Sequence, residues 1–189
     1  MKISNLAAAL LASALSLPAA AATLVPLADD GTWVSFDVDE FTSVSGGLEW
    51  IDLDGVDLAF SFTVTQDSLL RVVDLGFRGD RFAVSLSNGI TSQVLGQTSD
   101  VANPDVEFEN ILLDPDAALT DALYSKGSFM IGAGSWTVTG VMTQSADFGG
   151  APLNATFGAV SLTAVPVPAA GLLMLGAGGV LGMFARRRA

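Results

Sequence analysis

The stretch that decides the fold reads Leu58-Ala59-Phe60-Ser61-Phe62-Thr63-Val64. Leucine, phenylalanine and valine occupy every second position, and alanine, serine and threonine occupy the positions between them. Successive side chains of a β-strand point to opposite faces of the sheet, so this alternation predicts a strand with one buried side and one solvent-facing side. We therefore expect Phe62 to point into a hydrophobic core.

The same alternation recurs before and after this stretch, at residues 33–36, 70–75, 81–86, 128–131, 135–143 and 156–164. Asn88-Gly89 follows one of these segments and predicts a hairpin with a type I′ turn, because both residues tolerate positive φ angles. Gly132 and Gly134 predict a second turn. Several short alternating strands joined by such turns predict an all-β protein, an antiparallel and jelly-roll-like β-sandwich.

One short helix is expected within the sandwich, at residues 116–125. Asp114 can cap its N-terminus, and Pro115 fits the first helical position. Apolar residues follow at helical spacing, and Gly127 ends the pattern. We expect this helix to close one end of the sandwich, after a long acidic connection over residues 100–110.

The N-terminal 22 residues have the composition of a secretory signal peptide. Lys2 supplies a positive charge, an apolar run rich in alanine and leucine follows, and Ala20 and Ala22 form an A-x-A cleavage site. Cleavage there makes Thr23 the mature N-terminus. We therefore expect an exported protein whose sandwich occupies residues 23–164.

The C-terminal residues 165–189 predict a membrane anchor. Seventeen uncharged residues, 169–185, form an apolar run that begins after Pro166 and Pro168. As a helix this run reaches about 25 Å, the short end of what spans a bilayer. The cluster of Arg186, Arg187 and Arg188 then stays on the cytoplasmic side. A buried globular helix fits poorly, because the run is apolar on every face.

This tail resembles the PEP-CTERM protein-sorting signal of Gram-negative, exopolysaccharide-producing bacteria. The match consists of Val165-Pro166-Val167-Pro168-Ala169, the apolar run and the arginine cluster, with Val167 where the family motif has glutamate. The resemblance implies a membrane-embedded exosortase as partner. It also implies an inner-membrane-anchored stage, followed by residence at the cell surface or in the extracellular matrix. Residues 79–89 and 125–140 are also similar to a loosely defined class of PEP-CTERM ectodomains, which supports a β-rich fold.

The charge of the exported part is strongly acidic. Four of the eight basic residues lie in the two terminal segments, whereas all twenty acidic residues lie between them. Four basic against twenty acidic side chains give this part a formal net charge of −16, which disfavours nucleic acid and anionic lipid as partners. The chain contains no cysteine. The sandwich must therefore be held together by its hydrophobic core rather than by disulfides.

The residue types present exclude several kinds of catalytic site. Without histidine or cysteine there is no Ser-His-Asp triad, no cysteine nucleophile and no ordinary zinc or copper site. Paired carboxylates remain possible as a glycosidase pair. With sixteen aspartates on one surface, however, some pair will satisfy that spacing by chance. We therefore expect a protein that is not an enzyme.

The best candidate for a metal site is the segment Asp52-Leu53-Asp54-Gly55-Val56-Asp57. Alternate aspartates before a glycine resemble the start of a calcium loop, so Asp52, Asp54 and Asp57 are candidate Ca²⁺ ligands, with no other cofactor expected. The alternative is a hydrophilic turn between two strands. The three tryptophans Trp33, Trp50 and Trp136 could form a sugar-stacking platform, but their alternating apolar surroundings favour core packing.

Two hypotheses about function follow from these features. The first is an exported, non-catalytic protein of the cell surface or extracellular matrix, sorted through its tail and associated with exopolysaccharide or biofilm. The second is a carbohydrate- or calcium-binding module of that matrix. An exposed tryptophan beside an acidic groove would favour the second hypothesis.

Overall fold

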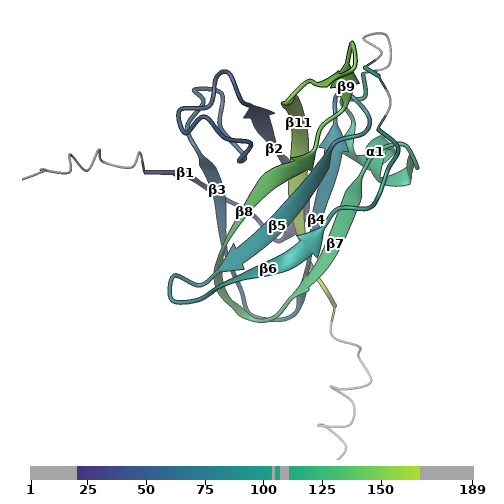
Figure 1. The fold of residues 1–189 in the computed structure, drawn as a ribbon. Coiled ribbons are helices and arrows are strands. Elements are labelled where there is room, and N and C mark those ends of the chain that lie inside the picture. Colours follow the sequence, from purple (N-terminus) through teal and green to yellow (C-terminus); the bar gives the residue numbers. More distant parts are fainter. Residues whose placement is uncertain (1–20, 104, 107–110, 167–189) are drawn as a thin grey trace, which may run out of the picture.

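The computed structural model describes residues 21–103, 105–106 and 111–166, which form two β-sheets packed face to face (Figure 1). Most neighbouring strands are antiparallel, so the all-β sandwich is confirmed. The elements in chain order are β1 (Thr23–Pro26), β2 (Asp30–Asp39), β3 (Leu58–Val64), β4 (Ser68–Leu75), β5 (Arg81–Ser87), β6 (Ser92–Gln97), α1 (Pro115–Thr120), β7 (Lys126–Ile131), β8 (Gly134–Gln144), β9 (Asp147–Phe148), β10 (Ala151–Pro152) and β11 (Ala155–Ala164).

The strands are distributed over a five-stranded sheet, a four-stranded sheet and a small hairpin. The five-stranded sheet has the order β1-β3-β8-β5-β6, and the four-stranded sheet has the order β2-β11-β4-β7. β9 and β10 form the hairpin before β11. β1 departs from the predicted antiparallel pattern, because it pairs in parallel with β3 at the sheet edge. Parallel neighbours need a long connection, and here β2 and the segment after it lie between the two strands.

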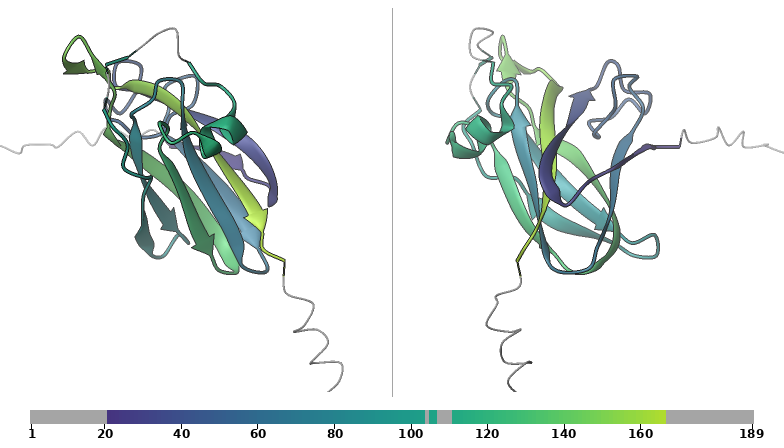
Figure 2. Two further views of the ribbon diagram at one scale, coloured as in Figure 1. Left: turned by 90° about the vertical axis from the view of Figure 1, so that its right-hand side faces the viewer. Right: turned by 180° about the vertical axis from the view of Figure 1, so that it is seen from behind.

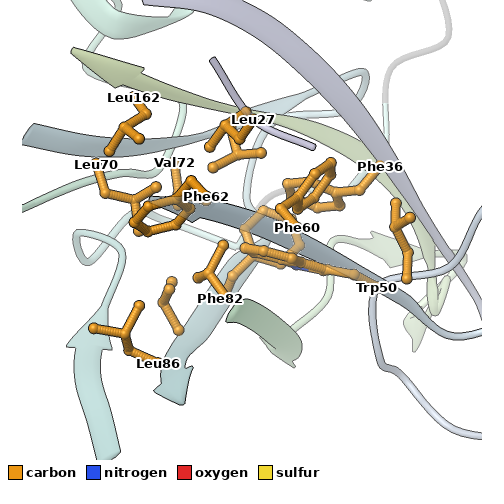
Figure 3. Packing of buried hydrophobic residues seen from close by; sticks show 14 of the residues in the cluster. Leu27, Phe36, Trp50, Phe60, Phe62, Leu70, Val72, Phe82, Leu86 and Leu162 are labelled. Atoms are coloured by element: carbon orange, nitrogen blue, oxygen red, sulfur yellow. The ribbon is translucent and has the colours of Figure 1, made fainter. Parts of the chain in front are cut away.

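The core lies between the two sheets and is dominated by aromatic rings (Figure 3). Phe62 is 7% exposed and contributes to it, as the alternation predicts. Trp50 stacks on Phe36 with ring centroids 4.1 Å apart, and Phe82 meets Phe36 edge-on at 5.2 Å. These rings come from β2, β3, β5 and the segment before β3, so one cluster holds both sheets together.

The segment of residues 48–51 joins the two sheets along one side of the sandwich. The Trp50 amide donates to Gly140 O of β8, and the Met142 amide of β8 donates to Leu48 O. Ile51 exchanges backbone hydrogen bonds with Asp37 of β2. The segment therefore takes the place of a strand that would otherwise leave backbone groups of β2 and β8 unpaired.

A second, smaller cluster lies on the outer face of the four-stranded sheet. Val73, Leu75 and Ala159 face outward there and are covered by Ala118 of α1 and by Tyr124. The left view of Figure 2 shows α1 lying over this face. Near α1 the four-stranded sheet is therefore apolar on both faces, with the core on its inner face and this second cluster on its outer face.

The helix and the hairpin differ in detail from their predictions. α1 ends at Thr120 rather than Ser125, because Asp121 is extended and its side chain accepts from the Leu123 amide. Asp114 caps α1 as predicted, accepting from the Asp116 amide at 3.0 Å. The β5–β6 hairpin is present, but its turn is not type I′: of its residues Gly89 has positive φ and Asn88 does not. The Asn88 side chain instead accepts from the Ile90 and Thr91 amides.

β11 carries the chain out of the sandwich (Figure 1). Immediately after it, the Val165 amide donates to Asp67 O at 2.9 Å. The Gln66 side chain donates to Val165 O at 3.2 Å. In the part of the chain that the structure describes, no helix is long and apolar enough to cross a membrane. The predicted membrane helix lies outside the described residues.

Candidate functional site

The outer face of the five-stranded sheet carries a hollow of about 530 Å³. Its floor is formed by the second half of β3, the first part of β8 and the end of β5. Pro26 and Leu27 border it on the β1 side, and Asn88 and Gly89 of the β5–β6 hairpin border it on the other. Figure 1 shows this hairpin projecting at the end of the sheet. The full lining is Pro26, Leu27, Ser61, Phe62, Thr63, Ser87, Asn88, Gly89, Ser135, Trp136 and Thr137. This lining contains no charged side chain.

Strand register arranges hydroxyl groups in rows across the floor. Ser61, Thr137 and Ser87 are partners in the ladders of three adjacent strands. Their side chains therefore form one row with a spacing of about 4.8 Å. Thr63 and Ser135 form the next row, with 2.9 Å between their hydroxyl oxygens. These residues alternate with buried ones, so the pattern that builds the core also builds this hydroxyl-lined floor.

A second hollow, of about 260 Å³, begins at Thr139, the next outward-facing residue of β8. Ser85 lies beside Thr139 in the ladder, and Glu49 and Asp57 lie at the rim. The Ser45 hydroxyl donates to Asp57 Oδ1 at 2.9 Å and lies 3.5 Å from Glu49 Oε2, so both carboxylates lie beside it. The two hollows follow one strand, and we call them together the β8 groove.

Gly140 allows Trp50 to approach the floor of the second hollow. A Cβ atom at Gly140 would lie 2.1 Å from Trp50 Cε2, so no side chain fits there. Trp50 is 1% exposed, and its indole N–H has no hydrogen-bond partner among the described residues. Both residues line the hollow.

A buried pair of carboxyl groups lies near the opposite end of β4 from the Val165 exit. Asp74 follows Leu70 and Val72 on the inner face of β4, and Asp80 lies in the turn before β5; they are 0% and 1% exposed. Asp80 Oδ1 accepts from the Ala146 amide at 2.7 Å. Within the described residues, both oxygens of Asp74 and Oδ2 of Asp80 lack a hydrogen-bond partner. Buried carboxyl groups of this kind favour the neutral, protonated form.

Burial shifts the pKa of both groups upward. It raises the pKa of Asp80 to about 6, and the Thr156 hydroxyl and the Ala146 amide only partly oppose this shift. Burial also raises the pKa of Asp74 well above its ordinary value, and the nearby Asp80 charge adds to this effect. The backbone amides of Gly79, Asp80 and Ser125 act in the opposite direction on the pKa of Asp74. Both carboxyl groups therefore keep their protons to a higher pH than an exposed aspartate does.

The acidic turn at residues 52–57 is organised by its own hydrogen bonds. Asp52 Oδ1 accepts from the Asp54 and Val56 amides, and its Oδ2 accepts from the Thr23 hydroxyl. Asp57 faces Ser45 instead. Among the described residues, no group of three acidic side chains is placed to hold a metal ion. This geometry favours the alternative of a hydrogen-bonded turn over a calcium loop.

We expect calcium to have no specific effect through this turn. Thermal melts in millimolar Ca²⁺, in Mg²⁺ and in sodium of matched ionic strength should shift equally, because screening of the acidic surface acts in all three. The Asp52→Asn/Asp54→Asn variant should respond to the three salts as the parent does. A calcium-specific rise that this variant loses would instead establish Asp52 and Asp54 as ligands.

Only some of the other predicted site residues belong to the part of the chain that the structure describes. Of the sorting motif, Val165 and Pro166 are described; Pro168 and the arginines Arg186, Arg187 and Arg188 lie outside the described residues, as does Ala20 of the cleavage site. Ala22 is exposed and precedes β1.

The three tryptophans do not form a platform. Trp50 is in the core. Trp33 lies near α1, where its indole N–H donates to Asp116 Oδ1, and Trp136 lines the first hollow.

A comparison with solved structures gives distant similarity. No family model matches the chain, and no curated protein matches it. The pre-peptidase C-terminal domain of a collagenase from Bacillus anthracis is similar in structure, with a TM-score of 0.38 and 8% sequence identity. The similarity covers 76% of this chain and 95% of that domain. It is too distant to bear on function.

Sequence reasoning missed both the β8 groove and the buried pair. The outward positions of β3 are visible in the sequence, but the strands that lie beside them follow from sheet order, which alternation alone does not give. The repetition of serine and threonine at outward positions of β5 and β8 was the available signal. Asp74 breaks the apolar inner face of β4 and was the corresponding signal for the buried pair.

Proposed function

We propose that this chain is an exported, non-catalytic protein of the cell surface or extracellular matrix, delivered through its C-terminal tail and associated with exopolysaccharide. The observation that carries the proposal is the order of parts in the sequence. A signal-peptide-like start precedes an acidic, cysteine-free sandwich, and a proline pair, an apolar run and three arginines end the chain. In this proposal the tail is the membrane helix that an exosortase-like enzyme recognises.

The geometry of the chain exit supports this arrangement. Val165, the first residue of the proposed sorting motif, is hydrogen-bonded to the β3–β4 turn at Gln66 and Asp67. The motif therefore begins where the sandwich ends, and no spacer separates them. A processing enzyme would meet the sandwich and the tail as neighbouring surfaces.

We also propose that the sandwich is a jelly roll. When the eight long strands are taken in chain order, the first pairs with the last, the second with the seventh, the third with the sixth and the fourth with the fifth. A strip of four nested hairpins wrapped into two sheets has this pairing. β1 is then an added edge strand, and β9–β10 is an insertion.

Replacing Arg186, Arg187 and Arg188 together with serine tests the proposed sorting. We expect loss of delivery to the cell surface or matrix, because the positive charges that hold the tail on the cytoplasmic side are removed. The measurement is the distribution of the protein among membrane, periplasmic and surface fractions. Replacement of the same residues with lysine keeps the charge and should leave delivery intact. Normal delivery of the serine variant would refute the proposal.

The alternative of a binding module is supported by a different observation, the β8 groove. Its hydroxyl-lined floor and the carboxylates at its far end are groups that hydrogen-bond to sugars. The two proposals are compatible, because a matrix protein needs a means of attachment to the matrix.

A further inference from the structure

The β8 groove has the length and shape of a site for an extended polymer. From Ser135 to Val141 its floor follows four successive outward positions of one strand, which is about 20 Å. β8 is the central strand of its sheet, so the floor is flanked on both sides. Pro26 and the β5–β6 hairpin form the walls of the first hollow.

The polar groups of the groove are available to a ligand. Among the described residues, the hydroxyls of Ser61 and Thr137 have no hydrogen-bond partner, although both side chains are half-buried. A hydroxyl can donate one hydrogen bond and accept others, so each of these side chains can donate to a sugar hydroxyl or accept from it. Glu49 and Asp57 supply acceptor oxygens in the second hollow, and the Ser45 hydroxyl orients the Asp57 carboxylate.

Charge decides between neutral and anionic ligands. The exported part carries twenty acidic and four basic side chains, yet none of them lines the first hollow. The second hollow adds two carboxylates and no cation. An anionic polymer would meet repulsion along the whole groove and from the surrounding surface. A neutral polymer would meet no such repulsion, and its hydroxyl groups could donate hydrogen bonds to the two carboxylates.

We propose that the β8 groove binds a strand of neutral, hydroxyl-rich polysaccharide. The inference rests on the proposed matrix function and names the ligand class and the residues that bind it. Ser61, Thr63 and Thr137 contact the polymer in the first hollow, and Glu49 and Asp57 accept from its hydroxyls in the second. An extended peptide is the competing occupant. It would pair with a sheet edge, whereas the groove lies over the central strands.

The test measures binding of the full-length chain, in non-ionic detergent, to polysaccharides cast into native gels. The probes are dextran, mannan, galactan and a β-1,3-glucan as neutral polymers, and alginate as an anionic one. We expect retardation by at least one neutral polymer and none by alginate. In the Thr63→Val/Thr137→Val variant, which keeps side-chain shape and removes two hydroxyls, the affinity should fall about tenfold. Thr65→Val/Thr143→Val is the matched control outside both hollows and should bind as the parent does.

Several outcomes would overturn the inference. These are retardation by none of the neutral polymers, retardation by alginate alone, or equal loss in the groove and control variants. Capture of an extended peptide that Thr63→Val/Thr137→Val abolishes would assign the groove to protein instead. Delivery of the parent and the groove variant to the matrix is measured in parallel by fractionation. Normal delivery without polysaccharide binding refutes the groove and leaves the proposed function standing, whereas failed delivery of the parent refutes the function itself.

Discussion

Replacing Trp50 with alanine is expected to destabilise the sandwich by about 3–5 kcal/mol, a large part of the stability of a domain of this size. Trp50 is 1% exposed, stacks on Phe36 and meets Phe60 and Phe82 edge-on, with ring centroids 6.1 and 6.4 Å away. Truncation removes the buried indole and leaves a cavity between the two sheets. The measurement is urea denaturation of a chain of residues 23–166, which ends with the last described residue.

Trp33→Ala is the matched control for this variant. Trp33 is half-buried near α1 and donates one hydrogen bond, at 3.0 Å, to Asp116 Oδ1. Removal of the Trp33 side chain should lower the free energy of unfolding by about 1–2 kcal/mol. Equal losses for the two variants would mean that the aromatic cluster between the sheets is not the main source of stability.

The second large effect expected is a loss of stability as the pH rises from about 4 to 7. The pKa of Asp80 is about 6 in the folded protein, against about 3.9 in an unfolded chain. Between these values the folded state binds more protons than the unfolded state, so the free energy of unfolding falls with rising pH. A difference of about two units corresponds to about 3 kcal/mol. The raised pKa of Asp74 acts in the same direction.

Asp80→Asn should remove most of this dependence and stabilise the protein at pH 7. The amide oxygen can still accept from the Ala146 amide, and the buried negative charge is gone. Asp52→Asn is the control with the opposite sign. Hydrogen bonds from the Thr23 hydroxyl and the Val56 amide lower the pKa of Asp52, so its contribution is present above the unfolded pKa and is lost as the pH falls. Urea denaturation of the parent and of each variant at pH 4, 5, 6 and 7 measures how the free energy of unfolding depends on pH in each. An unchanged pH slope in Asp80→Asn would rule out proton uptake by the pair.

Local patterns in the sequence were sufficient for seven of the eleven described strands and for the start of the helix, whereas β1, β6, β9 and β10 were not predicted. Alternation placed β3 at residues 58–64, because burial on one face selects every second residue. The cap at Asp114 was visible for the same reason, since it depends on neighbours in the chain. The turn type after β5 was wrong because Asn88 uses its side chain, rather than a positive φ angle, to close the loop.

Features that depend on distant contacts were not accessible from these patterns. β1 pairs in parallel with β3, although the two are separated by β2 and the segment that joins the sheets. The carboxyl groups of Asp74 and Asp80 become buried only in the assembled fold, where β4 and β5 lie in different sheets and the Ala146 amide donates to Asp80. The acidic turn shows the reverse case, since the spacing of Asp52 and Asp54 suggests ligands while the local hydrogen bonds use the Asp52 carboxylate.

The attachment of Val165 to Gln66 and Asp67 determines how the sandwich carries mechanical load. A pull on the chain beyond Pro166 acts along β11, which is paired on both sides, with β2 and with β4. Both ladders are antiparallel and run the length of the strand, so their hydrogen bonds lie across the direction of the pull and are loaded together in shear. Peeling would break such bonds one at a time. Force applied through this strand is therefore resisted by both ladders at once and is passed to β2 and β4 on either side.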